Sequence, residues 1–385
     1  MPSQRVVDNR LAAKCGADAR LAKCGADARL APGAALAAAT AQREAAAEAV
    51  AKATAKAQAR ARHPAAVGAS DVRVLALDMD GTTLNSAQQL APRTLAALRR
   101  ARAAGIEVVI ATGRPAYVLQ RTIDELALPG SEAAGVPCVN FNGACAMRMF
   151  PAPRPPQLLF AEALSEQTTA AALDVCEALG LCVSYTTADG ATAAPAGADH
   201  ERLLARFEAL EGVRQQRAPA AQPGGGGGGG GGGGCCRHLL GRVPALKVIA
   251  LSDTPEASAA AARAALPPGL CNVVAAEVHI EFLRADVSKG LSLRRLCGGG
   301  GGGGGGGHLG VGMDGVRAYG DNHNDVEMLR LAGQGVAMAN AKDAVKALPG
   351  VRVCEWSNDK DGVAREVELL LAARAANERR DDERE

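Results

Sequence analysis

The chain has 385 residues, with 43 Lys and Arg against 41 Asp and Glu, so its formal net charge is only +2. This near-neutral balance gives no reason to expect a nucleic acid, or a molecule with an acidic surface, as a partner. Hydrophobic residues make up 48% of the chain, which excludes complete disorder, and no apolar run approaches the length of a membrane span. The eleven scattered cysteines favour a reducing compartment. Because no C-x-x-C pair is present, the sequence supports neither a zinc ribbon nor a thioredoxin motif.

The first 70 residues differ in composition from the rest. They are rich in Ala, carry eleven Lys and Arg against five Asp and Glu, and contain A-K-C-G-A-D-A-R-L twice, at 13–21 and 22–30. Two copies do not make a solenoid, which needs about three units to bury a shared face. An acid-poor, Arg-containing leader is typical of an organelle transit peptide, and a non-targeting disordered tail is the alternative. The leader therefore predicts a chloroplast or another organelle as the location, and otherwise the cytoplasm.

From Asp71 onward, short apolar runs alternate with helix-like stretches. The runs that suggest strands are Val72–Leu77, Glu107–Ala111, Gln157–Glu162, Leu181–Tyr185, Ala245–Leu251, Asn272–Ala276, Val278–Leu283 and Arg317–Tyr319. The helical patterns are Leu95–Ala104, Ser165–Leu179, Pro255–Ala265 and Asp325–Leu331. This alternation predicts an α/β fold with a mostly parallel sheet.

Two homopolymeric tracts, Gly224–Gly234 and Gly298–Gly307, interrupt this pattern. Polyglycine has no side chains to pack, so both tracts are expected to be surface insertions, which a fold tolerates because loop-closure cost rises slowly with length. Cys235 and Cys236 follow the first tract and could be free thiols, a metal chelate or a vicinal disulfide. The tail Asn377–Glu385 is almost entirely charged and is expected to be solvated.

The sharpest chemical signal is Asp78 and Asp80 in D-M-D-G-T-T, directly after an apolar run. Ligands of open α/β sheets bind beyond the carboxyl ends of the strands. An extended backbone points residues i and i+2 the same way, so both carboxylates would lie on one rim, where their repulsion calls for a cation. Mg²⁺ fits because it prefers oxygen ligands. The alternative is an Asp-rich turn that caps the following helix.

Three further segments could join this rim. Asp321, Asn324 and Asp325 follow the run ending at Tyr319, although Asp321 or Asn324 could simply cap the next helix. Thr112 and Gly113 offer a hydroxyl and a backbone N–H suited to a phosphate. Lys289, before a glycine at an expected helix start, would supply the basic group.

In this order, D-M-D-G-T, T-G-R, S-K-G and G-D-x-x-N-D resemble the motifs of the haloacid dehalogenase (HAD) superfamily of phosphohydrolases, and most closely its Cof-type branch. The turn Asn142-Gly143-Ala144, the stretch Gly335–Ala341 and the closing Ser357–Val363 strengthen the resemblance, which covers roughly residues 71–373. It implies a Rossmann-like core with an inserted α/β cap. The implied domains are a leader at 1–70, a core at 71–153 and 284–373, a cap at 154–283 and a charged tail at 374–385.

The resemblance also implies roles for single residues. Asp78 would be the nucleophile that forms an aspartyl-phosphate, and Asp80 would be the general acid and base. Thr112 and Lys289 would hold the phosphoryl oxygens, with Gly113, Arg114, Asn142 and Gly143 on the substrate side; Arg114 could equally pack at a helix start. Mg²⁺ would be bound by the metal ligands Asp78, Asp80 (through its backbone carbonyl), Asp321, Asn324 and Asp325.

Two nearby residues are weaker candidates. Lys247 is also basic, but its surroundings look like an ordinary cap strand, so Lys289 is preferred as the phosphate lysine. His323 lies in the acidic loop, yet Mg²⁺ disfavours imidazole. If the second glycine tract broke the helix that begins near Ser288, Lys289 would lose its position. The first tract falls inside the expected cap and could alter access of the substrate.

The sequence therefore predicts a Mg²⁺-dependent phosphatase of small phosphorylated metabolites, such as sugar phosphates or flavin-pathway phosphates. The partner would be that small metabolite, with no nucleic acid or membrane involved. The alternatives are a sugar phosphomutase, which would return the phosphoryl group to its substrate, and a catalytically idle, ligand-binding relative.

Overall fold

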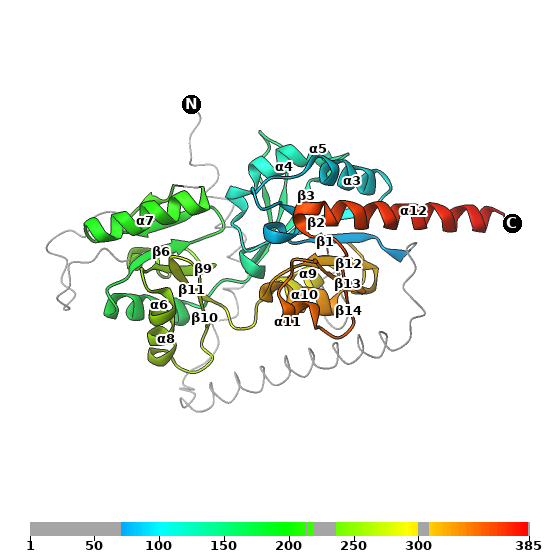
Figure 1. Ribbon diagram of the computed structural model, residues 1–385. Helices are drawn as coiled ribbons and strands as arrows, with labels where there is room; N and C mark the ends of the chain where they lie inside the picture. Colours follow the sequence, from blue (N-terminus) through cyan, green and yellow to red (C-terminus); the bar gives the residue numbers. More distant parts are fainter. Residues whose placement is uncertain (1–70, 213, 219–235, 299–307, 384–385) are drawn as a thin grey trace, which may run out of the picture. The chain divides into compact units, whose positions relative to one another are not determined.

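The computed structural model of the protein describes residues 71–212, 214–218, 236–298 and 308–383 (Figure 1). The expectations for the leader, Cys235 and nearly all of both glycine tracts lie outside these residues. Within the described part of the chain, no helix is long and apolar enough to cross a membrane.

The described residues form two sheets, and the larger has eight strands in the order β14-β13-β12-β1-β2-β3-β4-β5. Every pairing from β14 to β3 is parallel, whereas the β3–β4 and β4–β5 pairings are antiparallel, so β4 runs opposite to the other strands. This arrangement confirms the predicted mostly parallel α/β fold. The strands are β1 (Val74–Leu77), β2 (Glu107–Ala111), β3 (Val136–Asn140), β4 (Cys145–Met149), β5 (Gln157–Ala161), β12 (Val316–Gly320), β13 (Gln334–Ala337) and β14 (Val351–Val353).

Helices cover both faces of this sheet, which is why β1 is apolar throughout and buried at every residue. Helices α3 (Pro92–Ala103) and α12 (Gly362–Asp382) contact each other on one side, and α9 (Lys289–Cys297) and α10 (Val326–Leu331) do so on the other (Figure 1). The remaining short helices of this part are α4 (Gln120–Leu126), α5 (Ser131–Ala134) and α11 (Asp343–Lys346).

The central strand β1 is where the strand order changes direction. It pairs with β2, the next strand in the chain, on one edge and with the distant β12 on the other. A parallel sheet opens a crevice at such a point, beyond the carboxyl ends of the strands. The residues after Leu77, Ala111 and Gly320 therefore share one place in space.

The second sheet has six strands in the order β10-β11-β9-β6-β7-β8. They are β6 (Cys182–Thr186), β7 (Ala191–Ala194), β8 (Gln216–Arg217), β9 (Lys247–Leu251), β10 (Asn272–Ala275) and β11 (His279–Leu283). Helices α6 (Glu166–Ala178) and α8 (Pro255–Ala265) pack on the face that carries Val183 and Val248. Helix α7 (Ala198–Glu211) packs on the opposite face, against Ile249 and Leu251.

Three details differ from the expected organisation or refine it. The strand Gln157–Ala161, expected in the cap, pairs with β4 at the edge of the large sheet, although the cap boundary itself stays a prediction. The charged tail is not a separate segment, since α12 continues to Asp382, but residues 378–380, 382 and 383 are exposed, as expected of a solvated end. Helix α9 is intact, and it ends at Cys297 with Gly298 as its left-handed cap, so the start of the glycine tract does not break it.

A buried ion pair lies on the α7 face of the second sheet. The Nζ atom of Lys247 is 2.5 Å from Oε1 of Glu281, and both side chains are almost fully buried. Burial alone would raise the pKa of Glu281, but Lys247 and His279 outweigh it and lower the pKa from 4.5 to about 2. Glu281 therefore stabilises the fold at neutral pH, and this contribution is lost as the pH falls from the unfolded pKa toward the folded one.

We expect Glu281→Gln to lower the free energy of unfolding by about 3 kcal/mol at neutral pH, because Lys247 loses its buried counter-charge. The difference from wild type should shrink as the pH is lowered from about 4.5 toward 2. Urea titrations at several pH values measure it. Glu277→Gln, at an exposed carboxylate paired with Arg206, is the matched control and should show no such trend. A difference that is independent of pH would contradict the assignment.

Candidate functional site

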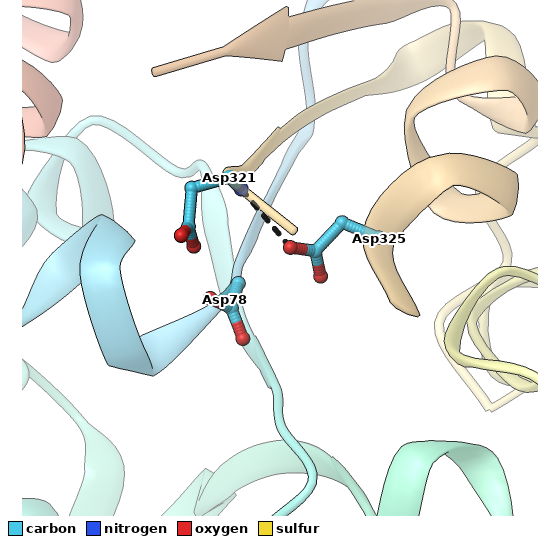
Figure 2. A group of neighbouring side chains, drawn as sticks. All are labelled: Asp78, Asp321 and Asp325. Carbon is cyan, nitrogen blue, oxygen red and sulfur yellow. Dashed lines mark hydrogen bonds between the residues drawn. The ribbon is translucent and has the colours of Figure 1, made fainter. Parts of the chain in front are cut away.

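Three carboxylates meet beyond the carboxyl ends of β1 and β12. Ligand oxygens of Asp78, Asp321 and Asp325 all lie within 4.8 Å of one another, from segments more than 200 residues apart in sequence. Figure 2 shows the three side chains beside one another, with a hydrogen bond from the Asp321 backbone N–H to Asp325. The backbone N–H of Asp78 still bonds to Tyr319, so the β1–β12 pairing sets the position of Asp78.

The turn after Asp78 brings the first loop against Asp321. Gly81 has a positive φ of 74°, and a Cβ added there would lie 2.5 Å from a carboxylate oxygen of Asp321. Only glycine permits both this conformation and this approach. The next residue, Thr82, donates a hydrogen bond of 2.9 Å to Asp321 Oδ1. The sequence D-G-T thus sets how closely the carboxylates of Asp78 and Asp321 approach each other. The motifs alone predicted only that both lie on the same edge of the sheet.

Lys289 is the basic group of this cluster. Its Nζ atom donates to Asp78 Oδ1 at 2.6 Å and to Asp325 Oδ1 at 2.8 Å, and its side chain is fully buried. The lysine is the first residue of α9, where the Ser288 hydroxyl caps the helix by accepting from Leu291 N–H. Gly143 permits the close packing, because a Cβ there would lie 2.3 Å from the Ser288 carbonyl oxygen.

The electrostatics of the cluster favour a divalent cation. Three carboxylates face one lysine ammonium, which leaves an excess of two negative charges when all are ionised. Burial raises the pKa of Asp78 well above its ordinary value, and Asp325 and Asp321 add to that rise while Lys289 opposes it. Burial also raises the pKa of Asp321. Burial would lower the pKa of Lys289, but Asp78 and Asp325 hold it above the ordinary value. An all-oxygen set with two excess negative charges suits Mg²⁺.

Asp325 organises the loop that carries Asp321. Its Oδ2 atom accepts the backbone N–H groups of Asp321 and Asn322 at 3.0 and 3.1 Å, and its Oδ1 atom accepts from Lys289. The alternative that Asp321 or Asn324 caps this turn is wrong in its residues, because the capping box is formed by Asn322 and Asp325. The same carboxylate that caps the turn also faces the cluster.

Asp80 does not point into the cluster. Residues Met79–Thr83 form a tight turn instead of an extended strand, so the expectation that Asp78 and Asp80 point the same way is wrong. The Asp80 carboxylate is solvent-exposed and accepts two hydrogen bonds from Arg114, at 2.9 Å from Nε and 2.5 Å from Nη2. Arg114 also bonds to Gln88. It is therefore bound to the proposed acid and base and not merely packed at a helix start.

The remaining candidates form one hydrogen-bonded neighbourhood. Thr112 is buried at the end of β2, and its hydroxyl accepts from the backbone N–H of Arg114. Asn142 donates its backbone N–H to the Thr112 carbonyl and accepts a bond from the side chain of Asn324 at 3.0 Å. A Cβ on Gly113 would lie 3.1 Å from Asn142 Oδ1. The side chain of Asn324 thus reaches Asn142.

Two asparagines were noticed in motifs but given no role from the sequence. The side chain of Asn340 donates to the Gly81 carbonyl at 2.7 Å, and that of Asn358 donates to the Leu84 carbonyl at 2.9 Å. Asn358 also donates its backbone N–H to Asn340 Oδ1. Together these hydrogen bonds hold the loop that follows Asp78 in place. The motifs G-V-A-M-A-N-A and S-N-D-K-D-G-V were the available signal.

Comparison with known proteins gives matches over most of the chain. A family model described as haloacid dehalogenase-like hydrolase matches residues 75–217 and 241–367, which is more than half of the chain. The Escherichia coli pyridoxal phosphate phosphatase YbhA is 27% identical over 291 residues, 74% of this chain and 95% of that protein. The chloroplastic Arabidopsis thaliana endoribonuclease YBEY is 29% identical over 74% of this chain but only 44% of its own length.

Solved structures show the same fold. The crystal structure of a haloacid dehalogenase-like hydrolase from Bacteroides thetaiotaomicron aligns with a TM-score of 0.60 at 21% identity, and the match covers 78% of this chain and 99% of that one. The resemblance drawn from the motifs is confirmed by the family match. The chain is therefore an enzyme of the haloacid dehalogenase-like hydrolase family.

Proposed function

We propose that the protein is a Mg²⁺-dependent phosphatase of small phosphorylated metabolites that works through an aspartyl-phosphate on Asp78. The observation that carries this proposal is the contact of 2.6 Å between Asp78 and the buried Lys289, inside a group of three carboxylates at the switch point of the sheet. The carboxylate and ammonium are fixed before substrate arrives, and phosphoryl transfer depends mainly on such positioning and charge neutralisation. The named phosphatase among the relatives supports the same chemistry.

In the first step, a carboxylate oxygen of Asp78 attacks phosphorus. A bond forms between that oxygen and phosphorus while the ester bond to the leaving oxygen breaks. Asp80 donates a proton to the leaving oxygen, and its carboxyl group is exposed and within hydrogen-bond distance of Arg114. Thr112 and Lys289 hold the phosphoryl oxygens during the transfer.

In the second step, the ionised Asp80 accepts a proton from water as that water attacks the phosphorus of the aspartyl-phosphate. The bond between phosphorus and the Asp78 oxygen breaks, which regenerates the carboxylate and releases inorganic phosphate. Asp80 ends the cycle protonated, as it began, so one residue serves both steps.

Asp78, Asp321 and Asp325 would hold the metal, with the Asp80 carbonyl and Asn324 completing or orienting its shell. Bound Mg²⁺ would neutralise the negative charge that the phosphoryl group and the carboxylates bring together. For the substrate, we propose sugar phosphates or flavin-pathway phosphates, and the relative that acts on pyridoxal phosphate adds an aromatic phosphate to this range. For the location, we propose an organelle such as the chloroplast, which the printed name of the Arabidopsis relative supports.

The test is phosphate release from acetyl phosphate and a panel of metabolite phosphates, with Mg²⁺ and after chelation of the metal. We expect release to depend on Mg²⁺ and to fall by at least about 100-fold on chelation, since the two excess negative charges would oppose an anionic substrate. Re-addition of Mg²⁺ should restore the rate. Release that is unaffected by chelation, or transfer of phosphoryl groups without free phosphate, would contradict the proposal.

A further inference from the structure

The helices that follow the two charged groups of the site lie side by side. Lys289 is the first residue of α9, and Asp325 directly precedes α10 (Figure 1). The Nζ atom of Lys289 and Oδ1 of Asp325 are 2.8 Å apart, so a small shift of one helix start relative to the other would change the arrangement of charge in the site. The contacts that fix the two helix starts therefore determine where the ammonium lies.

Helix α10 approaches the start of α9 very closely. A Cβ added to Gly290 would lie 2.6 Å from the carbonyl carbon of Glu327 and 2.7 Å from the backbone nitrogen of Met328. A side chain at residue 290 would push the two helices apart, because these backbone atoms cannot move aside as the end of a flexible side chain can. The glycine that follows Lys289 thus permits Glu327, in the first turn of α10, to approach the start of α9.

The Glu327 side chain contacts the residue that caps α9. The Ser288 hydroxyl donates a hydrogen bond to Oε2 of Glu327 and accepts one from the backbone N–H of Leu291 at 3.1 Å. A serine hydroxyl has one hydrogen to donate and lone pairs that accept, so it makes both bonds at once. The Glu327 carboxylate therefore joins the residue before Lys289 to the helix that follows Asp325.

A second set of contacts holds the start of α9 against Gly143. The Ser292 hydroxyl, one turn into the helix, donates a buried hydrogen bond of 2.6 Å to the Gly143 carbonyl. The Ser288 carbonyl packs on the same glycine, where a Cβ would lie 2.3 Å from its oxygen. A helix that is attached at one place can still tilt about that place. The contacts with Gly143 and with Glu327 together fix the direction of the helix start as well as its position.

The contact with Ser288 needs the acceptor oxygen of Glu327 more than its charge. Burial raises the pKa of Glu327, and the positive charge of Arg294, on α9, opposes that rise without cancelling it. An amide oxygen accepts a hydrogen bond from a hydroxyl as a carboxylate oxygen does. An amide at residue 327 would therefore keep the bond to Ser288 and lose only the attraction to Arg294.

We propose that Glu327 is a positioning residue, which sets the place of the Lys289 ammonium by holding Ser288. The inference rests on the proposed phosphatase function, in which Lys289 holds the phosphoryl oxygens during transfer. Glu327 acts through Ser288 and the helix start, without a contact of its own to the substrate. A displaced ammonium would neutralise less of the charge in the transition state, and a misplacement of about 1 Å lowers a rate by up to about 100-fold.

The first test measures kcat and KM of Glu327→Ala and Glu327→Gln, with the ester of the metabolite panel that the wild type hydrolyses fastest. We expect kcat of Glu327→Ala to fall by at least about tenfold and KM to change by less than about twofold, because the lost interaction acts in the transition state. Glu327→Gln keeps the acceptor for Ser288, so its kcat should stay within about threefold of the wild type. A smaller loss in Glu327→Ala, or an equal loss in Glu327→Gln, would overturn the inference.

Glu366→Ala is the matched control. It also removes a glutamate that joins a helix to another element, since Glu366 of α12 accepts a hydrogen bond of 2.8 Å from Arg352 of β14. This variant should lower the melting temperature at least as much as Glu327→Ala does and keep the kcat of the wild type. A loss of kcat in Glu366→Ala as large as that in Glu327→Ala would show that activity follows stability alone, and would overturn the inference.

The second test does not depend on catalysis. Lys289→Met, Glu327→Ala and the double variant are unfolded in urea with chelator present. If Glu327 holds Lys289 in place, the lysine contributes less stability when Glu327 is absent. Lys289→Met should then lower the urea midpoint of Glu327→Ala at most about half as far as that of the wild type. A larger decrease, up to an unfolded double variant, would overturn the inference. If no ester is hydrolysed, the phosphatase function fails, and the urea measurement alone decides the inference.

Discussion

Asp78→Asn should lower kcat/KM for every phosphate ester by at least about 1,000-fold, because the amide keeps the shape of the side chain but cannot attack phosphorus. The variant should nevertheless fold. Lys289 keeps Asp325 as a partner at 2.8 Å, and removal of one carboxylate from the cluster relieves repulsion that raises the pKa of Asp78. We therefore expect a free energy of unfolding equal to or above that of the wild type when metal is absent.

Phosphate release and urea denaturation, measured on the same preparations, check this prediction. A variant that loses activity but gains stability is typical of a residue that serves catalysis and does not stabilise the fold. Asp314→Asn is a suitable control, since Asp314 lies outside the cluster before β12 and should leave activity near the wild-type level. Retained activity in Asp78→Asn would show that another residue attacks phosphorus.

Lys289→Met should also abolish activity, by at least about 100-fold, but with the opposite effect on stability. The variant leaves Asp78 and Asp325 buried without the ammonium that lies between them. Breaking a buried ion pair by removing one partner costs about 3–5 kcal/mol. We expect a lowered free energy of unfolding at neutral pH, measured by urea denaturation in the presence of chelator.

The double variant Asp78→Asn/Lys289→Met separates the two contributions. It should recover part of the stability lost in Lys289→Met, because one of the two unpaired carboxylates is gone. Lys346→Met is the control, since Lys346 pairs with the fully exposed Asp343 and its loss should change stability by less than about 1 kcal/mol. If Lys289→Met were as stable as the wild type, the lysine would not be the counter-charge of this cluster.

The position of the site was predictable from the sequence, but its internal geometry was not. Apolar runs that end in Asp78, Thr112 and Asp321 indicate strand ends, and parallel strands bring their ends together. The direction of Asp80 was mispredicted because alternation holds only for extended chain, and the backbone turns directly after Asp78. Whether a side chain after a strand points inward depends on the turn, which a two-residue spacing does not specify.

The polar face of the second sheet, which carries Ser184, Thr186, Lys247 and Glu281, could not be predicted from the sequence for a different reason. Lys247 looks like an ordinary strand residue, because its neighbours Val248 and Ile249 are apolar and its ion-pair partner Glu281 is 34 residues away. The alternation of Cys182, Ser184 and Thr186 with Val183 and Tyr185 is visible in the sequence, yet it does not say which face is covered. Only the pairing of β6, β9 and β11 shows that the polar residues share one buried face.

The chain leaves α9 at Gly298 and returns to the same helix end. The backbone N–H of Leu309 donates to the Leu296 carbonyl, and that of Val311 donates to the Cys297 carbonyl. These hydrogen bonds hold the returning chain against the last two residues of the helix. A change in the number of residues between the helix and the returning chain should therefore strain neither Lys289 at the other end of the helix nor Asp321 beyond β12. A change in the length of this segment should therefore leave catalysis unaffected. The junction is a suitable insertion point for a reporter domain in an enzyme that must stay active.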